Sequence, residues 1–208
     1  NCEFTQPLIL MNTYNFELLE FSQTIRSFVR CRVEDERNLI DLVPKYFKSE
    51  LISNDEVVLL GGYDYNISNS SNKVFSIING TIMKANPMNF ARQYFSTCID
   101  KINSFLYIIG GYNKETGVLA SCERLSLKSK QWQEIEDLNT PRLNNCSAAL
   151  DGTHVYTFGG LGKFDYLSSI ERYNIKLNIW SELLVQMPNK ISNAQACSIN
   201  KNEIIIMG

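Results

Sequence analysis

Few side chains of this 208-residue chain could carry out catalysis or bind a metal ion. The one histidine is His154, whereas copper sites and most zinc sites need two or three. It follows the turn 151–153, where we interpret it as a surface histidine. None of the six cysteines forms a Cys-x-x-Cys pair, which is the usual spacing of a zinc site. The sequence therefore predicts no bound metal and no cofactor.

Paired carboxylates occur twice, at Glu134 and Glu136 and at Asp55 and Glu56. They lie on or beside expected strands and loops, and nothing makes them converge on a substrate. The chain also has no Gly-x-Ser-x-Gly motif, no phosphate-binding loop and no Gly-x-Gly-x-x-Gly motif. We therefore expect that the chain is not an enzyme.

Contact residues are better candidates for function, and they cluster in loops that follow pairs of glycines. Tyr63, Asp64 and Tyr65 follow one pair, and Tyr112 and Asn113 follow the next. Tyrosine is a rigid, amphipathic side chain that is enriched at protein interfaces. These five residues are our candidates for binding a partner.

The elements that must position these loops are strands that end on the glycines. Runs of strand-forming residues at 57–60, 106–109 and 155–158 each end on two glycines, and a fourth run ends at residue 208. The glycines are Gly61, Gly62, Gly110, Gly111, Gly159, Gly160 and Gly208. The first glycine of each run recurs every 49 residues, and a period near 50 is the signature of a propeller repeat. Glycine suits a strand end that needs a positive φ or a close approach of backbones.

Each repeat offers four short strand candidates, which in the third repeat are 145–150, 155–158, 168–174 and 179–184. Four short strands in about 50 residues are typical of a propeller blade. No amphipathic helix of ten or more residues interrupts them, so we expect an all-β fold. We expect one incomplete domain over residues 1–208, with blades at about 1–30 (partial), 45–89, 90–138, 139–187 and 188–208 (partial). The first partial blade would contribute two strands, at 8–15 and 18–24.

About a dozen extra residues separate the first partial blade from the first full one, most of them within 33–48. Residues 34–43 could form one or two helical turns, because apolar residues there recur at helical spacing. Insertions in repeat proteins map to loops on one face, often the binding face. A binding loop and a neutral loop therefore both stay open as interpretations.

The pattern within the repeats resembles the kelch family. Kelch repeats carry paired glycines, then a charged residue before a Tyr, then a Trp six or seven residues later. Tyr173 and Trp180 occupy these positions, and Trp132 follows Leu125 at the same spacing. The resemblance implies a fragment of a kelch-type β-propeller with four-stranded antiparallel blades, about three full and two partial. It also implies that the glycines, Tyr173, Trp132 and Trp180 are structural, and that Tyr173 and Trp180 pack between blades.

Arg92 and Arg142 stand just before the first strand of their repeats. In kelch propellers, an arginine at this position borders the central shaft, on the face that grips acidic peptides. A guanidinium can form two hydrogen bonds with one carboxylate, which suits peptide recognition. The alternative is a structural arginine that is hydrogen-bonded within the fold, and the sequence does not decide between the two.

The resemblance implies a protein–protein interaction module or scaffold, such as a substrate adaptor. The partner would be another protein, with an acidic peptide, a ligase component or actin as possibilities. Two alternatives stay open: a propeller that binds a carbohydrate or small ligand, and an enzyme whose catalytic blades are missing. The net charge of −2 predicts no nucleic-acid partner, and no apolar run approaches the ~20 residues of a membrane helix. Cys98, Cys146 and Cys197 lie at equivalent positions of their repeats, and we interpret them as small, buried hydrophobic residues. Such cysteines fit a reducing compartment, so we expect a cytoplasmic protein.

Overall fold

The structure is a computed structural model that describes residues 9–12, 17–22, 27–31 and 33–208, with side chains from residue 33 onward. The chain forms two compact units, Asn1–Pro87 and Met88–Gly208. The prediction of a single domain with the blade limits given above stays a prediction.

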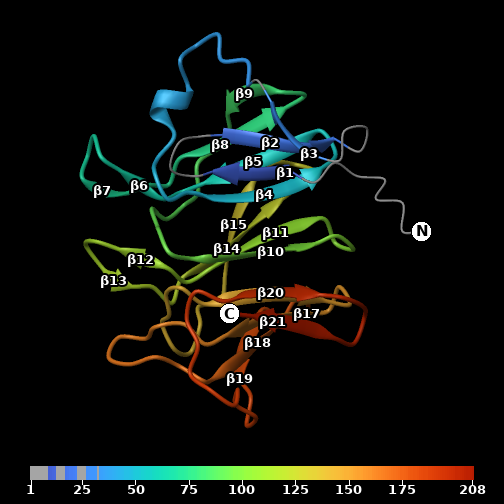
Figure 1. The fold of residues 1–208 in the computed structure, drawn as a ribbon. Helices are drawn as coiled ribbons and strands as arrows, with labels where there is room; N and C mark the ends of the chain where they lie inside the picture. The colour runs from blue at the N-terminus through green and yellow to red at the C-terminus, as the bar shows by residue number, and fades with distance from the viewer. Residues whose placement is uncertain (1–8, 13–16, 23–26, 32) are drawn as a thin grey trace. The chain divides into compact units, whose positions relative to one another are not determined.

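The first unit contains a three-stranded and a four-stranded antiparallel sheet (Figure 1). The three-stranded sheet consists of β1 (Ile9–Asn12), β2 (Glu17–Ser22) and β3 (Ser27–Cys31). The four-stranded sheet consists, in spatial order, of β4 (Lys48–Ser53), β5 (Glu56–Leu60), β8 (Val74–Ile78) and β9 (Thr81–Lys84). A short hairpin of β6 (Tyr63–Asp64) and β7 (Asn69–Ser70) connects β5 to β8.

The second unit contains two more four-stranded antiparallel sheets and a two-stranded one. The first consists of β10 (Ser96–Asp100), β11 (Phe105–Ile109), β14 (Cys122–Ser126) and β15 (Trp132–Ile135), with a hairpin of β12 (Tyr112–Asn113) and β13 (Gly117–Val118). The second consists of β16 (Cys146–Leu150), β17 (His154–Phe158), β18 (Ile170–Asn174) and β19 (Ile179–Glu182). The last consists of β20 (Gln195–Ser198) and β21 (Ile204–Met207). The all-β prediction with three full blades flanked by partial ones is confirmed.

The N-terminal sheet differs in one strand from the prediction. The sequence pattern predicted strands at 8–15 and 18–24, of which residues 8, 13–15, 23 and 24 lie outside the described residues. The structure adds β3, which the sequence did not predict. We missed it because its last residues begin the charged segment 30–37, which reads as a loop.

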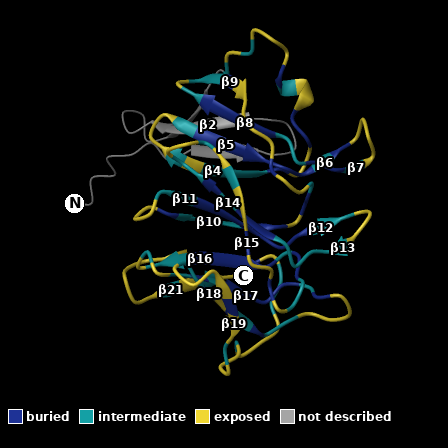
Figure 2. Ribbon diagram, turned by 180° about the vertical axis from the view of Figure 1, so that it is seen from behind, coloured by how far each residue is buried: buried dark blue, intermediate teal, exposed yellow. Residues whose placement is uncertain are grey.

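The second strand of each four-stranded sheet is largely buried, as the colours of Figure 2 show. On β11, residues 106–109 have no exposed surface. Apolar side chains of β11 alternate between the two faces of the sheet, and both faces are covered. This explains why the runs before the glycines are continuously apolar instead of alternating.

One aromatic cluster connects the two full blades of the second unit. Tyr173 and Trp180 are cross-strand partners on β18 and β19, with ring centroids 5.2 Å apart. The ring of Tyr107 on β11 lies 6.1 Å from that of Tyr173. The indole N–H of Trp180 donates to the carbonyl of Glu136, just after β15, at 3.0 Å. Trp132 lies on the outer strand β15, where it is the cross-strand partner of Leu125 on β14, and it is only partly buried.

None of the four cysteines from residue 33 onward forms a disulfide. Cys98, Cys122 and Cys146 are buried, and burial raises the pKa of Cys122 to about 12. This thiol therefore stays protonated at neutral pH and is a poor nucleophile. Cys197 was expected to be buried as well, and that expectation is wrong: it is exposed on the two-stranded sheet β20–β21.

The inserted segment 33–47 covers one face of the β4–β5–β8–β9 sheet. It contains the 3₁₀ turn η1 (Ile40–Leu42), and among the described residues no helix is long and apolar enough to span a membrane. Leu39, Val43 and Phe47 are buried in one cluster with apolar residues of β5, β8 and β9. The interpretation as a neutral loop is therefore incomplete, because the segment contributes to the core.

Candidate functional site

The loops that carry the candidate contact residues begin at strand ends whose backbone geometry requires glycine. The φ angles of Gly110 and Gly111 are 64° and 107°. A Cβ on Gly111 would lie 2.8 Å from the carbonyl oxygen of Gln93 and 2.9 Å from the Cβ of Phe95. Both the conformation and the space therefore require glycine. The N–H of Gly111 donates to the carbonyl of Arg142 at 2.8 Å, which ties this loop to the next blade.

Each loop is also tied to the segment that enters the innermost strand of its own blade. The residue after each glycine pair forms an isolated antiparallel bridge with that segment. The three bridges are Lys45–Tyr63, Gln93–Tyr112 and Leu143–Leu161. They fix the bases of the loops, and they show which positions of the three blades are equivalent. In Figure 1, the β6–β7 and β12–β13 hairpins each project from one end of their own sheet.

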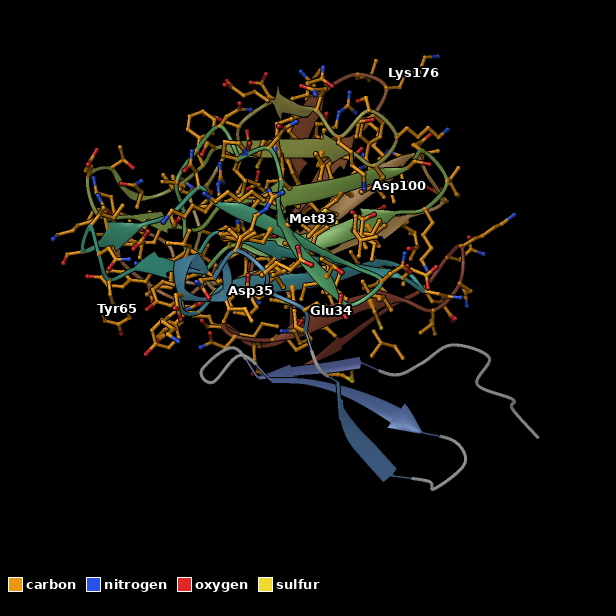
Figure 3. The ribbon with its side chains drawn as sticks, turned by 90° about the horizontal axis from the view of Figure 1, so that it is seen from above. Glu34, Asp35, Tyr65, Met83, Asp100 and Lys176 are labelled. Atoms are coloured by element: carbon orange, nitrogen blue, oxygen red, sulfur yellow. The ribbon has the colours of Figure 1, made fainter. Side chains whose placement is uncertain are left out.

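The loop of the first unit presents a pair of tyrosines. Tyr63 and Tyr65 contact each other edge to face, with ring centroids 4.9 Å apart. Tyr65 is 62% exposed and Ile67 is 64% exposed, and Tyr65 lies at the edge of the molecule in Figure 3. The hairpin therefore offers an aromatic and an aliphatic side chain to solvent, on a backbone held by β6–β7 pairing.

Asp64 holds this loop from the inside. Its carboxylate is almost fully buried and accepts hydrogen bonds from the Nζ of Lys73 at 2.6 Å and the N–H of Asn66 at 3.0 Å. Burial alone raises the pKa of Asp64, but these hydrogen bonds outweigh it and hold the pKa below its ordinary value. Asp64 is therefore charged at neutral pH, and its role in partner binding stays a prediction.

Asp64→Asn should destabilise the fold at pH 7, because the charged carboxylate is the form that the loop stabilises. A carboxyl whose folded pKa is depressed contributes stability above its unfolded pKa, here 3.8, and loses it as the pH falls through the folded value. Urea unfolding of both proteins at pH 7 and at about pH 2.5 measures the difference. Asp55→Asn, at an exposed turn, is the control. A difference that does not shrink at the lower pH would contradict the prediction.

The loops of the second unit differ from one another in what they expose. Tyr112 and Asn113 are half-buried. Asn113 donates through Nδ2 to the carbonyl of Ala91 at 2.8 Å, and its Oδ1 accepts the N–H of Glu115 at 2.8 Å, so it stabilises the hairpin. In the third loop, Phe164 is 90% exposed and Tyr166 is exposed as well. We did not predict these two, although the loop's place after a glycine pair is the signal that marks them.

A second set of residues at this end of the blades was missed. Tyr46, Tyr94, Asn144 and Asn193 occupy equivalent positions just before the innermost strands, with φ angles of 56°, 57°, 52° and 60°. In the second unit, the N–H of Asn144 donates to the carbonyl of Tyr94, and the N–H of Asn193 donates to the carbonyl of Asn144. Positive φ is unfavourable for tyrosine, and such strain concentrates at functional sites. Both tyrosines are exposed.

Arg92 and Arg142, the candidates for binding an acidic partner, are completely buried. Nη2 of Arg142 donates to Oε1 of Glu171 at 2.6 Å, and Nη1 donates to the carbonyl of Gly159 at 3.0 Å. Arg92 repeats the arrangement with Glu123 at 3.1 Å. Each pair lies within a single blade. These contacts are those of the structural interpretation, and the binding role stays a prediction.

The two glutamates are satisfied by backbone as well as by arginine. Glu171 accepts the N–H groups of Asn139 and Thr140 at 2.8 and 3.0 Å, which orders the segment leading to Arg142. Burial raises the pKa of Glu123, and it lowers that of Arg92, because desolvation penalises both charged forms while their mutual attraction opposes the shifts.

The first full blade replaces this ion pair with apolar residues. The bridges and strand registers place Pro44 at the position of the arginines and Phe75 at the position of the glutamates. Both residues are buried. The fold therefore tolerates two uncharged residues in place of the arginine and the glutamate, which is expected if the ion pair is structural.

A metal centre has no counterpart among the residues from 33 onward, where no group of three His, Cys, Asp or Glu side chains could hold an ion. His154 interacts with its neighbour Thr153, whose hydroxyl lies 2.7 Å from Nδ1. Glu134 lies on the outer strand β15 and Glu136 directly follows it, and both are exposed.

Comparison with known proteins agrees with this geometry. The KLHDC2/KLHL20/DRC7 Kelch-repeats domain model matches residues 47–208. Kelch-like protein 26 of Danio rerio is 25% identical over 181 residues, which is 84% of this chain and 27% of that protein. A RING finger domain and kelch repeat-containing protein of Dictyostelium discoideum is 27% identical over 148 residues, 69% of this chain and 14% of that protein.

An enzyme is also among the relatives. N-acetylneuraminate epimerase of Vibrio cholerae is 27% identical over 116 residues, 52% of this chain and 29% of that protein. The chain thus spans less than a third of the length of each of these three relatives. The match over 47–208, the glycine-ended strands and the four-stranded blades together establish that the chain belongs to the kelch-repeat family.

Proposed function

We propose that this chain recognises another protein through the loops that follow its glycine pairs. The observation that carries the proposal is the exposure of large apolar and aromatic side chains at these loops. Tyr65 and Ile67 are exposed in the first unit, and Phe164 and Tyr166 are exposed in the second. Their backbones are held by bridges and side-chain hydrogen bonds, so ordering them on binding costs little entropy.

The chemistry of these side chains suits a protein surface. Aromatic residues supply a large contact area with few rotatable bonds and dominate the energetics of interfaces. Tyr94 adds a further exposed ring at the same end of the second unit. Among relatives, names such as kelch-like protein and kelch repeat-containing protein describe the repeat and not a partner, so they support the class of module only.

The finer predictions stay proposals. An acidic peptide, a ligase component or actin are the partners that we consider, with a role as scaffold or substrate adaptor in the cytoplasm. We propose that Arg92 and Arg142 act on binding only by holding their blades together, since neither has exposed surface. Recognition of carboxylates would then fall to other groups of the loops.

Quantitative affinity capture tests the proposal. The immobilised chain is incubated with lysate of the cells that express it, and the bound proteins are quantified by mass spectrometry. The variant Phe164→Ser/Tyr166→Ser should lose a specific set of partners at least tenfold. Its urea midpoint should match the wild type, because both side chains are exposed.

Leu177→Ser/Ile179→Ser is the matched control. These residues are similarly exposed, but they lie at and beside the β18–β19 turn, at the opposite end of the same blade. Loss of the same partners in the control, or their retention by the Phe164/Tyr166 variant, would contradict a binding site at the loop end.

A sugar-binding function is the second candidate, and the epimerase relative favours it. Isothermal titration calorimetry of the chain with N-acetylneuraminate tests whether it binds this sugar. Saturable heat that disappears in the Phe164→Ser/Tyr166→Ser variant would support it, and absence of heat would leave protein recognition as the proposal.

A further inference from the structure

The outer strand β9 already accepts an additional strand from its own chain. The N–H of Glu34 donates to the carbonyl of Gly80 at 2.8 Å, and the N–H of Ile82 donates to the carbonyl of Glu34 at 3.1 Å. This is a one-residue parallel bridge between Glu34 and Thr81, formed on the edge of β9 that faces away from β8. The pairing could continue along β9, but the chain turns away.

Asp35 causes the turn. Its carboxylate accepts the N–H groups of Leu39 and Ile40 at 2.6 and 2.8 Å, and the chain enters η1. Backbone groups on one edge of a strand belong to alternate residues. The carbonyl of Ile82 and the N–H of Lys84 therefore point the same way as the N–H of Ile82, which donates to Glu34. Among the described residues, neither of these two groups has a backbone partner. Figure 3 labels Glu34, Asp35 and Met83 in this region.

A cleft of about 370 Å³ lies beside this open edge. Its lining comes from the inserted segment and from β9: Glu36, Arg37, Leu39, Thr81, Ile82, Met83 and Lys84. Leu39 and Ile82 belong to the core, whereas Met83 is partly exposed, so the cleft can receive an apolar side chain. Arg37 and Lys84 bring two positive charges to this region, and Glu34, Asp35 and Glu36 bring three negative ones, so charge gives no preference for an acidic segment.

We propose that β9 binds an extended segment of a partner protein by strand addition, with an apolar side chain in the cleft. The backbone of the segment pairs with Ile82 and Lys84, where the pairing begun by Glu34 stops. This surface is independent of the loops proposed above, because it lies on the outer strand of the blade.

The probe is a fluorescent, blocked hexapeptide of alternating threonine and valine, whose binding to the whole chain is followed by fluorescence polarisation. We expect saturable binding. The same peptide with alternate amides N-methylated should bind at least tenfold more weakly, because it cannot donate to the edge. The same peptide with alanine in place of valine, which leaves the cleft unfilled, should also bind more weakly. No binding of the first peptide, or equal binding of the N-methylated one, would overturn the proposal.

Lys84→Pro removes only an N–H that points away from β8, a position where an edge strand tolerates proline. It should weaken binding at least tenfold, whereas Lys84→Ala, which keeps the N–H, should weaken it less. Glu134→Pro at the equivalent position of β15 is the matched control and should bind as the wild type does. Unchanged binding to Lys84→Pro would contradict strand addition at this edge. The N-methylated peptide tests the same point without any change to the protein.

Discussion

Trp180→Ala should lower the free energy of unfolding by about 3–5 kcal/mol, as expected for a buried aromatic side chain. Trp180 is only 4% exposed and packs on Tyr173, and its indole N–H reaches the carbonyl of Glu136 in the neighbouring blade. The change therefore removes a packed ring and a hydrogen bond between blades together. Urea unfolding followed by circular dichroism measures the loss, provided that the transition is cooperative.

Trp132→Ala provides the comparison, since this indole lies on the outer strand of the preceding blade and is only partly buried. We expect a clearly smaller loss of unfolding free energy, because folding buries less of the apolar surface of Trp132 than of Trp180. A loss below about 1 kcal/mol for Trp180→Ala would mean that the cluster with Tyr107 and Tyr173 does not hold the blades together.

Arg142→Ala should also cost about 3–5 kcal/mol, because it leaves the buried carboxylate of Glu171 without its cation. Both side chains have no exposed surface. The carbonyls of Gly159 and Ser169 would each lose the hydrogen bond from the guanidinium as well, and they lie at the strand end that positions the third loop. Equilibrium unfolding gives the stability, and the capture experiment gives binding by the loop.

Two further variants separate a structural pair from a binding residue. Glu171→Gln keeps one acceptor oxygen, which can serve Asn139 or Thr140 but not both, and it leaves the charge of Arg142 unpaired. The double variant Arg142→Met/Glu171→Gln removes both charges and should cost less than the sum of the two single changes. A stable Arg142→Ala protein that has lost its partner would instead show that the arginine binds directly.

The sequence and the structure agree best where the backbone itself sets the residue type. Gly111 has a positive φ and no room for a Cβ, so only glycine serves there, and the recurrence of such pairs every 49 residues marks the repeat. Short apolar runs before them predict buried strands for the same local reason. The short strand β3 escaped because it has no glycine pair and ends in a charged segment.

Only part of the candidate site could be predicted from the sequence. Tyr65 follows a glycine pair and is exposed, as the pattern of the loops indicates. Tyr46 and Tyr94 have no sequence signal, because positive φ at a tyrosine is imposed by the chain entering the innermost strand and not by the residue. The inserted segment 33–47 was recognised by its length, but its packing onto β5, β8 and β9 depends on residues far along the chain.

By itself, the sequence determined that this protein is a series of four-stranded blades with exposed loops after paired glycines, because those features depend on local backbone geometry and repeat at a constant spacing. Only the tertiary structure decided what its charges do. Arg142 and Glu171 are 29 residues apart in the chain and meet at 2.6 Å in the interior. Whether an arginine faces solvent or a buried carboxylate depends on which strand lies beside it, and that is a property of the folded blade.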